Sequence, residues 1–260
     1  MNLVWLDVSD NHFDGKLQDN IEKIIPKLEY LNLSHNHFEG NLPSLKGDLS
    51  NLWVLDLSFN NFYGEVPIEL VANCTSCRIL RVLDLSFNNF CGEIFSIHFN
   101  LSLHSLELQN NNFTGTLLVV PLKVGWLLNI SNNHMTGTIP LWAVNRSTSP
   151  SRAVDLSNNF FEGQIPCGLP SSEIINISHN LLSGLLPFCL NLQDVGHLLL
   201  QGNKLTGSLP KAIMTLDNRD NRFIGSIPHE IDGLSNLKVL SFSGNHFSGV
   251  ISKQLSQLKR

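Results

Sequence analysis

The segment from Leu55 to Pro67, which reads L-D-L-S-F-N-N-F-Y-G-E-V-P, decides the fold because versions of it recur along the whole chain. Eleven times an Asn is followed four residues later by Gly and six residues later by Leu, Ile or Val. We call these the ladder asparagines: Asn11, Asn36, Asn60, Asn88, Asn111, Asn133, Asn159, Asn180, Asn203, Asn221 and Asn245. Such a strict period predicts a solenoid in which each repeat stacks on the next.

The spacing and the pattern within each repeat narrow the fold further. Successive ladder asparagines are 18 to 28 residues apart, which is the range of leucine-rich repeats and excludes longer helical and propeller units. Apolar and polar residues alternate from Leu55 to Ser58, so we expect one short strand per repeat. We therefore predict a single leucine-rich-repeat solenoid over residues 1–260, a curved right-handed superhelix of about eleven repeats with a parallel sheet on its concave face.

The residues after each strand predict how the chain returns. Each ladder Asn can satisfy backbone groups where the coil turns away from the sheet. Seven repeats carry Pro three residues after the Gly, which favours a 3₁₀ or irregular convex face over a long helix. A large apolar residue stands two positions after each ladder Asn, as at Phe62 and Phe90. Its register with the repeat predicts a buried spine of side chains.

The frame L-x-x-L-x-L-x-x-N, continued by x-(L/F)-x-G-x-(I/L)-P, resembles the plant-specific leucine-rich repeats of receptor kinases and receptor-like proteins. The resemblance covers essentially the whole chain, and the absence of a kinase-like segment favours a receptor-like protein, with this chain as an ectodomain fragment. It implies extracellular recognition of a peptide, glycan or protein ligand, and immune or developmental signalling through a co-receptor kinase at the plasma membrane. Two alternatives stay open: a secreted inhibitor of cell-wall-degrading enzymes resembling the polygalacturonase inhibitors, and a truncated, non-signalling fragment.

Composition excludes several other classes. A net charge of −5 and a pI near 6.0 give no reason to expect a nucleic-acid partner. The longest apolar stretch, residues 117–130, is too short and too interrupted to span a bilayer. The chain shows neither a signal peptide at Met1 nor recognisable caps at its ends. Its Asp, Ser and His residues follow the repeat pattern, so we expect no enzyme, no cofactor and no metal.

The outward strand positions of repeats three to five are the strongest candidates for ligand contact. Phe59 and Phe87 precede ladder asparagines in adjacent repeats, and exposed neighbouring aromatic rings indicate a binding hot spot. Acidic residues on the same strands favour a basic or hydroxyl-rich ligand. The predicted contact residues are Asp56, Ser58, Phe59, Asp84, Ser86, Phe87, Glu107 and Gln109.

Sequons and cysteines suggest modifications of a secreted protein. The glycosylation candidates are Asn32, Asn73, Asn100, Asn112, Asn129, Asn145 and Asn176. Of the five cysteines, Cys167 and Cys189 follow their own ladder asparagines at nearly the same distance. Stacking brings these two near each other, as a disulfide or as two buried thiols.

The tenth repeat departs from the pattern. Only 18 residues separate Asn203 from Asn221, and Asn218 takes a position that is apolar elsewhere. We expect a weak strand at Asn218 and a tightened return over residues 211–215.

Overall fold

The computed structural model describes residues 2–19, 21–43, 51–71, 79–95, 102–117, 123–140, 151–167, 172–187, 195–208, 216–226 and 241–251. The chain divides into two compact units, Met1–Met135 and Thr136–Arg260, and each unit is taken by itself below. Both are solenoids of short parallel strands with almost no helix, as the repeat pattern predicts. The organisation of residues 1–260 as one domain stays a prediction.

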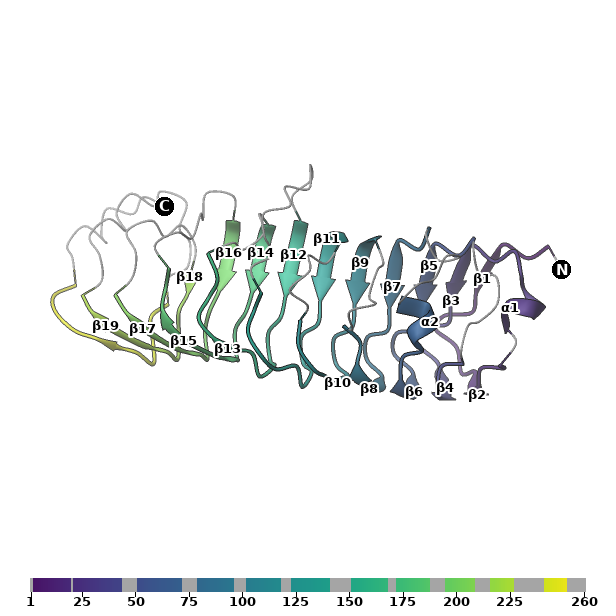
Figure 1. The fold of residues 1–260 in the computed structure, drawn as a ribbon, viewed down its shortest axis with the longest axis horizontal. Coiled ribbons are helices and arrows are strands. Elements are labelled where there is room, and N and C mark those ends of the chain that lie inside the picture. The colour runs from purple at the N-terminus through teal and green to yellow at the C-terminus, as the bar shows by residue number, and fades with distance from the viewer. Residues whose placement is uncertain are drawn as a thin grey trace. The chain divides into compact units, whose positions relative to one another are not determined.

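One strand per repeat builds the main sheet of the first unit (Figure 1). Its strands pair in parallel in the order β1 (Trp5–Asp7), β3 (Tyr30–Asn32), β5 (Val54–Asp56), β7 (Val82–Asp84), β9 (Ser102–Glu107) and β11 (Lys123–Asn129). Equivalent residues pair with each other, so that Asp56 lies opposite Asp84 and Asp84 opposite Glu107. We call the outward side of this sheet the strand face.

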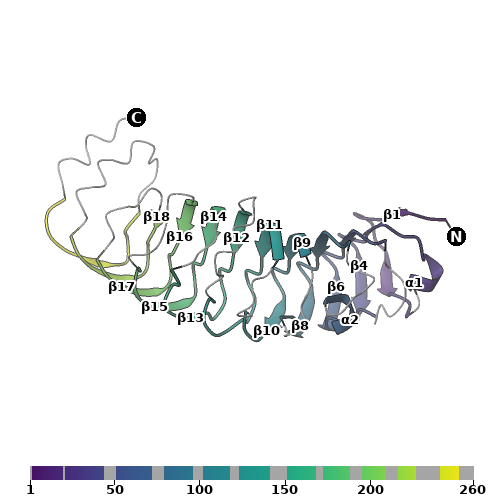
Figure 2. The same ribbon diagram turned by 45° about the horizontal axis from the view of Figure 1, so that its top comes forward.

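A second parallel sheet runs along the other side of the coils, as both ribbon views show (Figures 1 and 2). Its strands are β2 (Asp14–Lys16), β4 (His37–Gly40), β6 (Asn61–Glu65), β8 (Asn89–Glu93) and β10 (Asn112–Thr114), paired in that order. These strands were not predicted from the sequence, whose proline pattern favours a 3₁₀ or irregular return. Two four-residue helices, α1 (Ile21–Ile24) and α2 (Ile68–Val71), follow the second sheet in repeats one and three.

The second unit repeats the same two-sheet plan. Its main sheet contains β12 (Ser151–Asp155), β14 (Ser172–Asn176), β16 (Val195–Leu199) and β18 (Leu216–Asp217) in parallel. Its second sheet contains β13 (Glu162–Gly163), β15 (Leu181–Leu185), β17 (Lys204–Gly207), β19 (Arg222–Gly225) and β20 (His246–Phe247).

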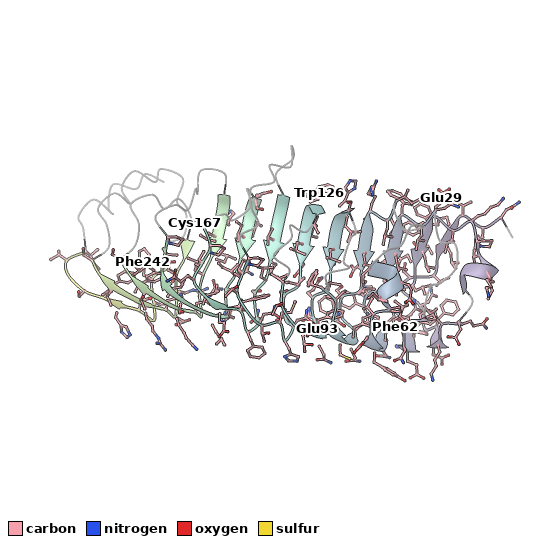
Figure 3. All side chains as sticks on the ribbon, in the orientation of Figure 1. Glu29, Phe62, Glu93, Trp126, Cys167 and Phe242 are labelled. Carbon is pink, nitrogen blue, oxygen red and sulfur yellow. The ribbon has the colours of Figure 1, made fainter. Side chains whose placement is uncertain are left out.

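The core lies between the two sheets of each unit and is built from repeat-register residues. Leu55 and Leu57 are buried beneath β5, and the spine ring Phe62, labelled in Figure 3, is fully buried. Spine rings of neighbouring repeats pack in parallel, with 6.0 Å between the centroids of Phe62 and Phe90. Burying such a ring contributes roughly 1.5–3 kcal/mol, so the spine is a major source of stability.

The ladder asparagines join adjacent coils through hydrogen bonds. The amide nitrogen of Asn60 donates to the carbonyl oxygens of Leu57 and Ser58 in its own repeat and to that of Leu33 in the preceding repeat, at 2.9–3.2 Å. Its Oδ1 accepts the backbone N–H of Phe38 at 3.0 Å. Because a buried amide without partners costs roughly 1–3 kcal/mol, these bonds explain why the position is Asn in every repeat.

Asn218 is the clear exception in the second unit. The strand before it, β18, ends at Asp217, directly before Asn218, as β5 ends at Asp56, directly before the equivalent Leu57. The backbone N–H of Asn218 donates to the carbonyl oxygen of Ser241 at 3.4 Å. The equivalent bond, from the backbone N–H of Leu57 to the carbonyl oxygen of Asp84, is 2.9 Å long. The side chain is fully buried, and neither its nitrogen nor its oxygen has a hydrogen-bond partner. The long backbone hydrogen bond agrees with a weak strand at Asn218, whereas the full length of this strand and the return over residues 211–215 stay predictions because residues 211–215 lie outside the described residues.

Candidate ligand-binding surface on the strand face

The residue before every ladder Asn has a left-handed backbone. Its φ lies between 51° and 69° in all eleven repeats. Asn, Asp, His or Gly occupies nine of these positions, and such residues tolerate this conformation. The other two are Phe59 and Phe87, each with φ 52°. Bulky residues held in this region are strained, and retained strain often accompanies a functional site.

The left-handed backbone places three rings in one continuous stack. The ring centroid of Phe59 lies 4.0 Å from that of His35 on one side and 4.0 Å from that of Phe87 on the other. The interplanar angles are 13° and 11°. Phe59 remains 40% exposed and Phe87 39% exposed. We call His35, Phe59 and Phe87 the ring stack. Phe59, the middle member, has a ring stacked on each side, whereas His35 and Phe87 each stack on one side within the trio.

A row of carboxylates lies on the same face: Asp56 and Asp84 stand three residues before Phe59 and Phe87, and Glu107 takes the paired position on the next strand. Asp56, Asp84 and Glu107 occupy paired positions on β5, β7 and β9, so neighbours lie about 4.8 Å apart along the sheet. One oxygen of each carboxylate accepts a hydrogen bond from a nearby Ser. The other oxygens, Asp56 Oδ2, Asp84 Oδ2 and Glu107 Oε2, have no partner among the described residues. We call this group the carboxylate row.

The carboxylate at the centre of the row, Asp84, has acidic neighbours and no paired cation among the described residues. The pKa of Asp84 is raised to about 7, mainly by burial and to a smaller degree by the charges of Glu107 and Asp56, against the lowering effect of hydrogen bonds from Ser86. Among the described residues, no Lys or Arg forms an ion pair with any member of the row. A cation at this position would meet a carboxylate that is desolvated and uncompensated.

The structure separates the eight predicted contact residues into two groups. Five of them lie on the strand face: Asp56, Asp84 and Glu107 at paired positions, and Phe59 stacked on Phe87. Ser58 and Ser86 are instead buried, and the Ser58 hydroxyl donates to Asp56 Oδ1 at 2.7 Å. These two residues orient the carboxylates and do not offer surface to a ligand. Gln109 is half-buried, and its side-chain oxygen is buried without a hydrogen-bond partner.

The sequence reasoning missed other aromatic residues on the strand face. His35 belongs to the ring stack, and Trp5 stacks on Tyr30 with 3.7 Å between ring centroids. Trp53 and Trp126 are also exposed, and Trp126 is labelled beside β11 in Figure 3. The position of His35 beside Phe59 could have been predicted, because His35 stands directly before a ladder Asn, as Phe59 and Phe87 do.

The described sequons differ in their surroundings. Asn112 is exposed on β10, at the second sheet. Asn32, Asn129 and Asn176 are half-buried on the strand face, and each accepts a hydrogen bond from the Ser of its own sequon. Asn73, Asn100 and Asn145 lie outside the described residues.

Among the described cysteines, Cys167 is disulfide-bonded and Cys91 is a free thiol. Cys189 lies outside the described residues, so its pairing with Cys167 stays a prediction.

Within the described residues, no group of three or more His, Cys, Asp or Glu side chains could hold a metal ion. In the same part of the chain, no helix has the length and apolarity needed to cross a membrane.

Comparison with known proteins agrees with the repeat architecture. The family model described as Leucine Rich Repeat matches residues 2–24, 27–49, 51–74, 80–101 and 236–258. Solved structures that are similar include the plant peptide hormone receptor RGFR1 in complex with RGF2, at 28% identity and a TM-score of 0.86, covering 99% of this chain and 42% of that one. The Arabidopsis receptor kinase HAESA ectodomain in complex with an IDA peptide hormone is 30% identical, with a TM-score of 0.82, covering 99% and 44%. The chain is a leucine-rich-repeat protein.

Curated relatives specify the class. Receptor-like protein 54 of Arabidopsis thaliana is 32% identical over 241 residues, covering 80% of this chain and 30% of the relative. Receptor-like protein 35 of the same plant is 33% identical over 274 residues, covering 99% and 28%. The chain belongs with the plant leucine-rich-repeat receptor-like proteins, and it spans about a third or less of the length of these relatives.

Proposed function

We propose that this chain is part of the extracellular ligand-recognition region of a plant receptor-like protein, and that the strand face of its first unit binds the ligand. The observation that carries the proposal is the patch formed by the ring stack and the carboxylate row. Aromatic rings are typical of hot-spot residues at the centre of a binding surface, and neighbouring charges give such a surface specificity. Parallel strands hold them in fixed positions, which lowers the entropy lost on binding.

The similar receptors support this choice over catalysis. The HAESA and RGFR1 structures contain peptide hormones, and another HAESA structure, 25% identical with a TM-score of 0.72, also contains the co-receptor SERK1. By analogy, we propose a peptide or protein ligand and a membrane co-receptor kinase, with a role in immunity or development at the outer side of the plasma membrane. The patch supplies neither a nucleophile with a base nor a group poised to stabilise a transition state.

The test is to select ligands and locate them. A library of displayed random peptides is selected on the 260-residue chain, and enriched peptides are mapped by hydroxyl-radical footprinting with mass spectrometry. We expect the peptides to protect Phe59 and Phe87 from oxidation. Tyr63, which is 46% exposed on β6 in the same repeat as Phe59, should react as in the free protein. Failure to enrich any peptide, or protection of Tyr63 instead of the rings, would contradict the proposal.

A further inference from the structure

The ring stack and the carboxylate row together restrict the chemistry of the ligand. We infer that this surface binds an arginine side chain of a peptide segment, with its aliphatic stem on the ring edges and its guanidinium on the carboxylate row. The inference rests on the proposed binding function of the strand face and names the ligand class for it.

The geometry of the ring stack disfavours a sugar or a cation held on a face of its central ring, Phe59. Both of those ligands need the flat, electron-rich face of an aromatic ring. Phe59 has a ring 4.0 Å away on each side, nearly parallel to its own plane. Its faces are therefore covered, and its exposed edge carries the positive end of the ring quadrupole. Such an edge packs well against aliphatic carbon atoms.

The carboxylate row supplies the complementary charge. Three neighbouring carboxylates each direct one oxygen into a hydrogen bond with Ser and leave the other unpaired within the described part of the chain. A guanidinium presents five N–H donors in one plane and can bridge oxygens of adjacent carboxylates. Among the described residues no Lys or Arg pairs with the row, and burial together with the adjacent charges raises the pKa of Asp84 to about 7.

Arginine joins the two features better than lysine does. Asp56 and Phe59 lie three residues apart in one repeat. A ligand side chain must therefore lie on the ring stack and also reach a carboxylate. Arginine has an aliphatic stem that can lie on apolar surface while its charged end remains paired. Its planar guanidinium also matches carboxylate geometry and is less strongly hydrated than an ammonium group.

The test compares three blocked heptapeptides of alternating leucine with arginine, lysine or citrulline, titrated calorimetrically into the 260-residue chain. Citrulline keeps the shape of arginine and removes its charge. We expect the arginine peptide to bind at least about tenfold more tightly than the citrulline peptide, with the lysine peptide between them. Equal affinities for the arginine and citrulline peptides, or no binding of the arginine peptide, would overturn the inference.

Two matched double variants separate a local site from general attraction to an acidic protein. Asp56→Asn with Glu107→Gln removes two charges from the strand face, and Glu65→Gln with Glu93→Gln removes two from β6 and β8. Only the first should abolish the advantage of arginine over citrulline. Equal losses from both would overturn the inference.

Chitohexaose is the glycan probe. Binding of this sugar that is lost on Phe59→Asn would overturn the inference while leaving the strand face as a binding surface. Failure of the proposed function is a different result, because then no ligand of any kind would map to the rings.

Discussion

Phe59 and Phe87 stack with 4.0 Å between their ring centroids although both residues have a left-handed backbone. In nine other repeats the equivalent residue is Asn, Asp, His or Gly, which adopt that conformation at little cost. Two neighbouring repeats thus keep rings where the backbone favours other residues. A ligand that contacts the rings would explain why they are kept. Because Asn is common at the equivalent position, replacing either Phe by Asn should remove a ring without disturbing the fold.

Replacing Phe59 by Asn should leave stability nearly unchanged. The change removes two stacking contacts, worth about 0.5–1.5 kcal/mol each, and relieves backbone strain of roughly 1–2 kcal/mol. Phe62→Ala on the buried spine should instead destabilise the fold by about 3–5 kcal/mol. Denaturant unfolding of the purified variants measures both. A loss of stability in Phe59→Asn as large as that in Phe62→Ala would show that the ring stack is structural.

Replacing Asn218 by Leu should raise the free energy of unfolding by about 1 kcal/mol or more, because it removes a buried amide without partners. Thermal unfolding followed by circular dichroism shows whether the variant is more or less stable than the unsubstituted protein. The matched control is Asn203→Leu, since Asn203 donates to Ile177 and Leu200 and accepts from Leu182. That control should be strongly destabilising. A destabilised Asn218→Leu protein would mean that the amide has an unrecognised partner.

The buried carboxylate of Asp84 should make stability depend on pH. Its pKa is raised from 3.8 to about 7 in the folded protein, so between these values the folded state keeps a proton that the unfolded chain releases. The free energy of unfolding therefore falls as pH rises from about 4 to about 7, by up to about 4 kcal/mol, and then levels off. Asp56 and Glu107, on β5 and β9, are the charged neighbours that contribute.

The variant Asp84→Asn should lose this pH dependence, as measured by unfolding titrations at several pH values. Asp7→Asn serves as the control because the Ser9 hydroxyl lowers the pKa of Asp7, so its stabilising effect is lost only as pH falls below about 4. An unchanged slope between pH 4 and 7 in Asp84→Asn would contradict the assignment.

Glycosylation should be more complete at Asn112 than at Asn176 when the protein is secreted from plant cells. Asn112 is exposed on β10, whereas the Asn176 amide nitrogen donates to Asp155 Oδ2 at 3.1 Å. Peptide mapping after enzymatic deglycosylation measures the occupancy of each sequon. Higher occupancy at Asn176 would show that the strand face of the second unit accepts a glycan despite this contact.

Most of the fold follows from the repeat, because the period of Leu, Asn and Gly is a strong local signal that stacking reinforces. The second sheet was missed because a segment such as Asn61–Glu65 contains Gly and carries no clear alternation. Its strands form only because neighbouring coils bring equivalent segments together. Long-range pairing of this kind is not visible within one repeat.

The candidate site was predictable in part. Phe59 and Phe87 stand out in the sequence as aromatic residues before ladder asparagines, and the acidic residues of successive repeats share a register on adjacent strands. The burial of Ser58 and Ser86 was not apparent, because an outward strand position does not reveal that the hydroxyl turns back to the preceding Asp. The left-handed backbone could have been predicted from the sequence, since Asn, Asp, His or Gly stands directly before the ladder Asn in most repeats.

The central claim is that a ligand contacts the ring stack, and affinity measurements on three proteins test it most directly. With any peptide selected on this chain, calorimetry compares the unsubstituted protein, the Phe59→Asn, Phe87→Asn double variant and the Tyr63→Asn control. Because each ring should contribute about 1–2 kcal/mol as a hot-spot residue, the double variant should bind at least about tenfold more weakly. Tyr63→Asn should bind normally. Equal affinity in all three proteins, or an equal loss in both variants, would contradict the claim.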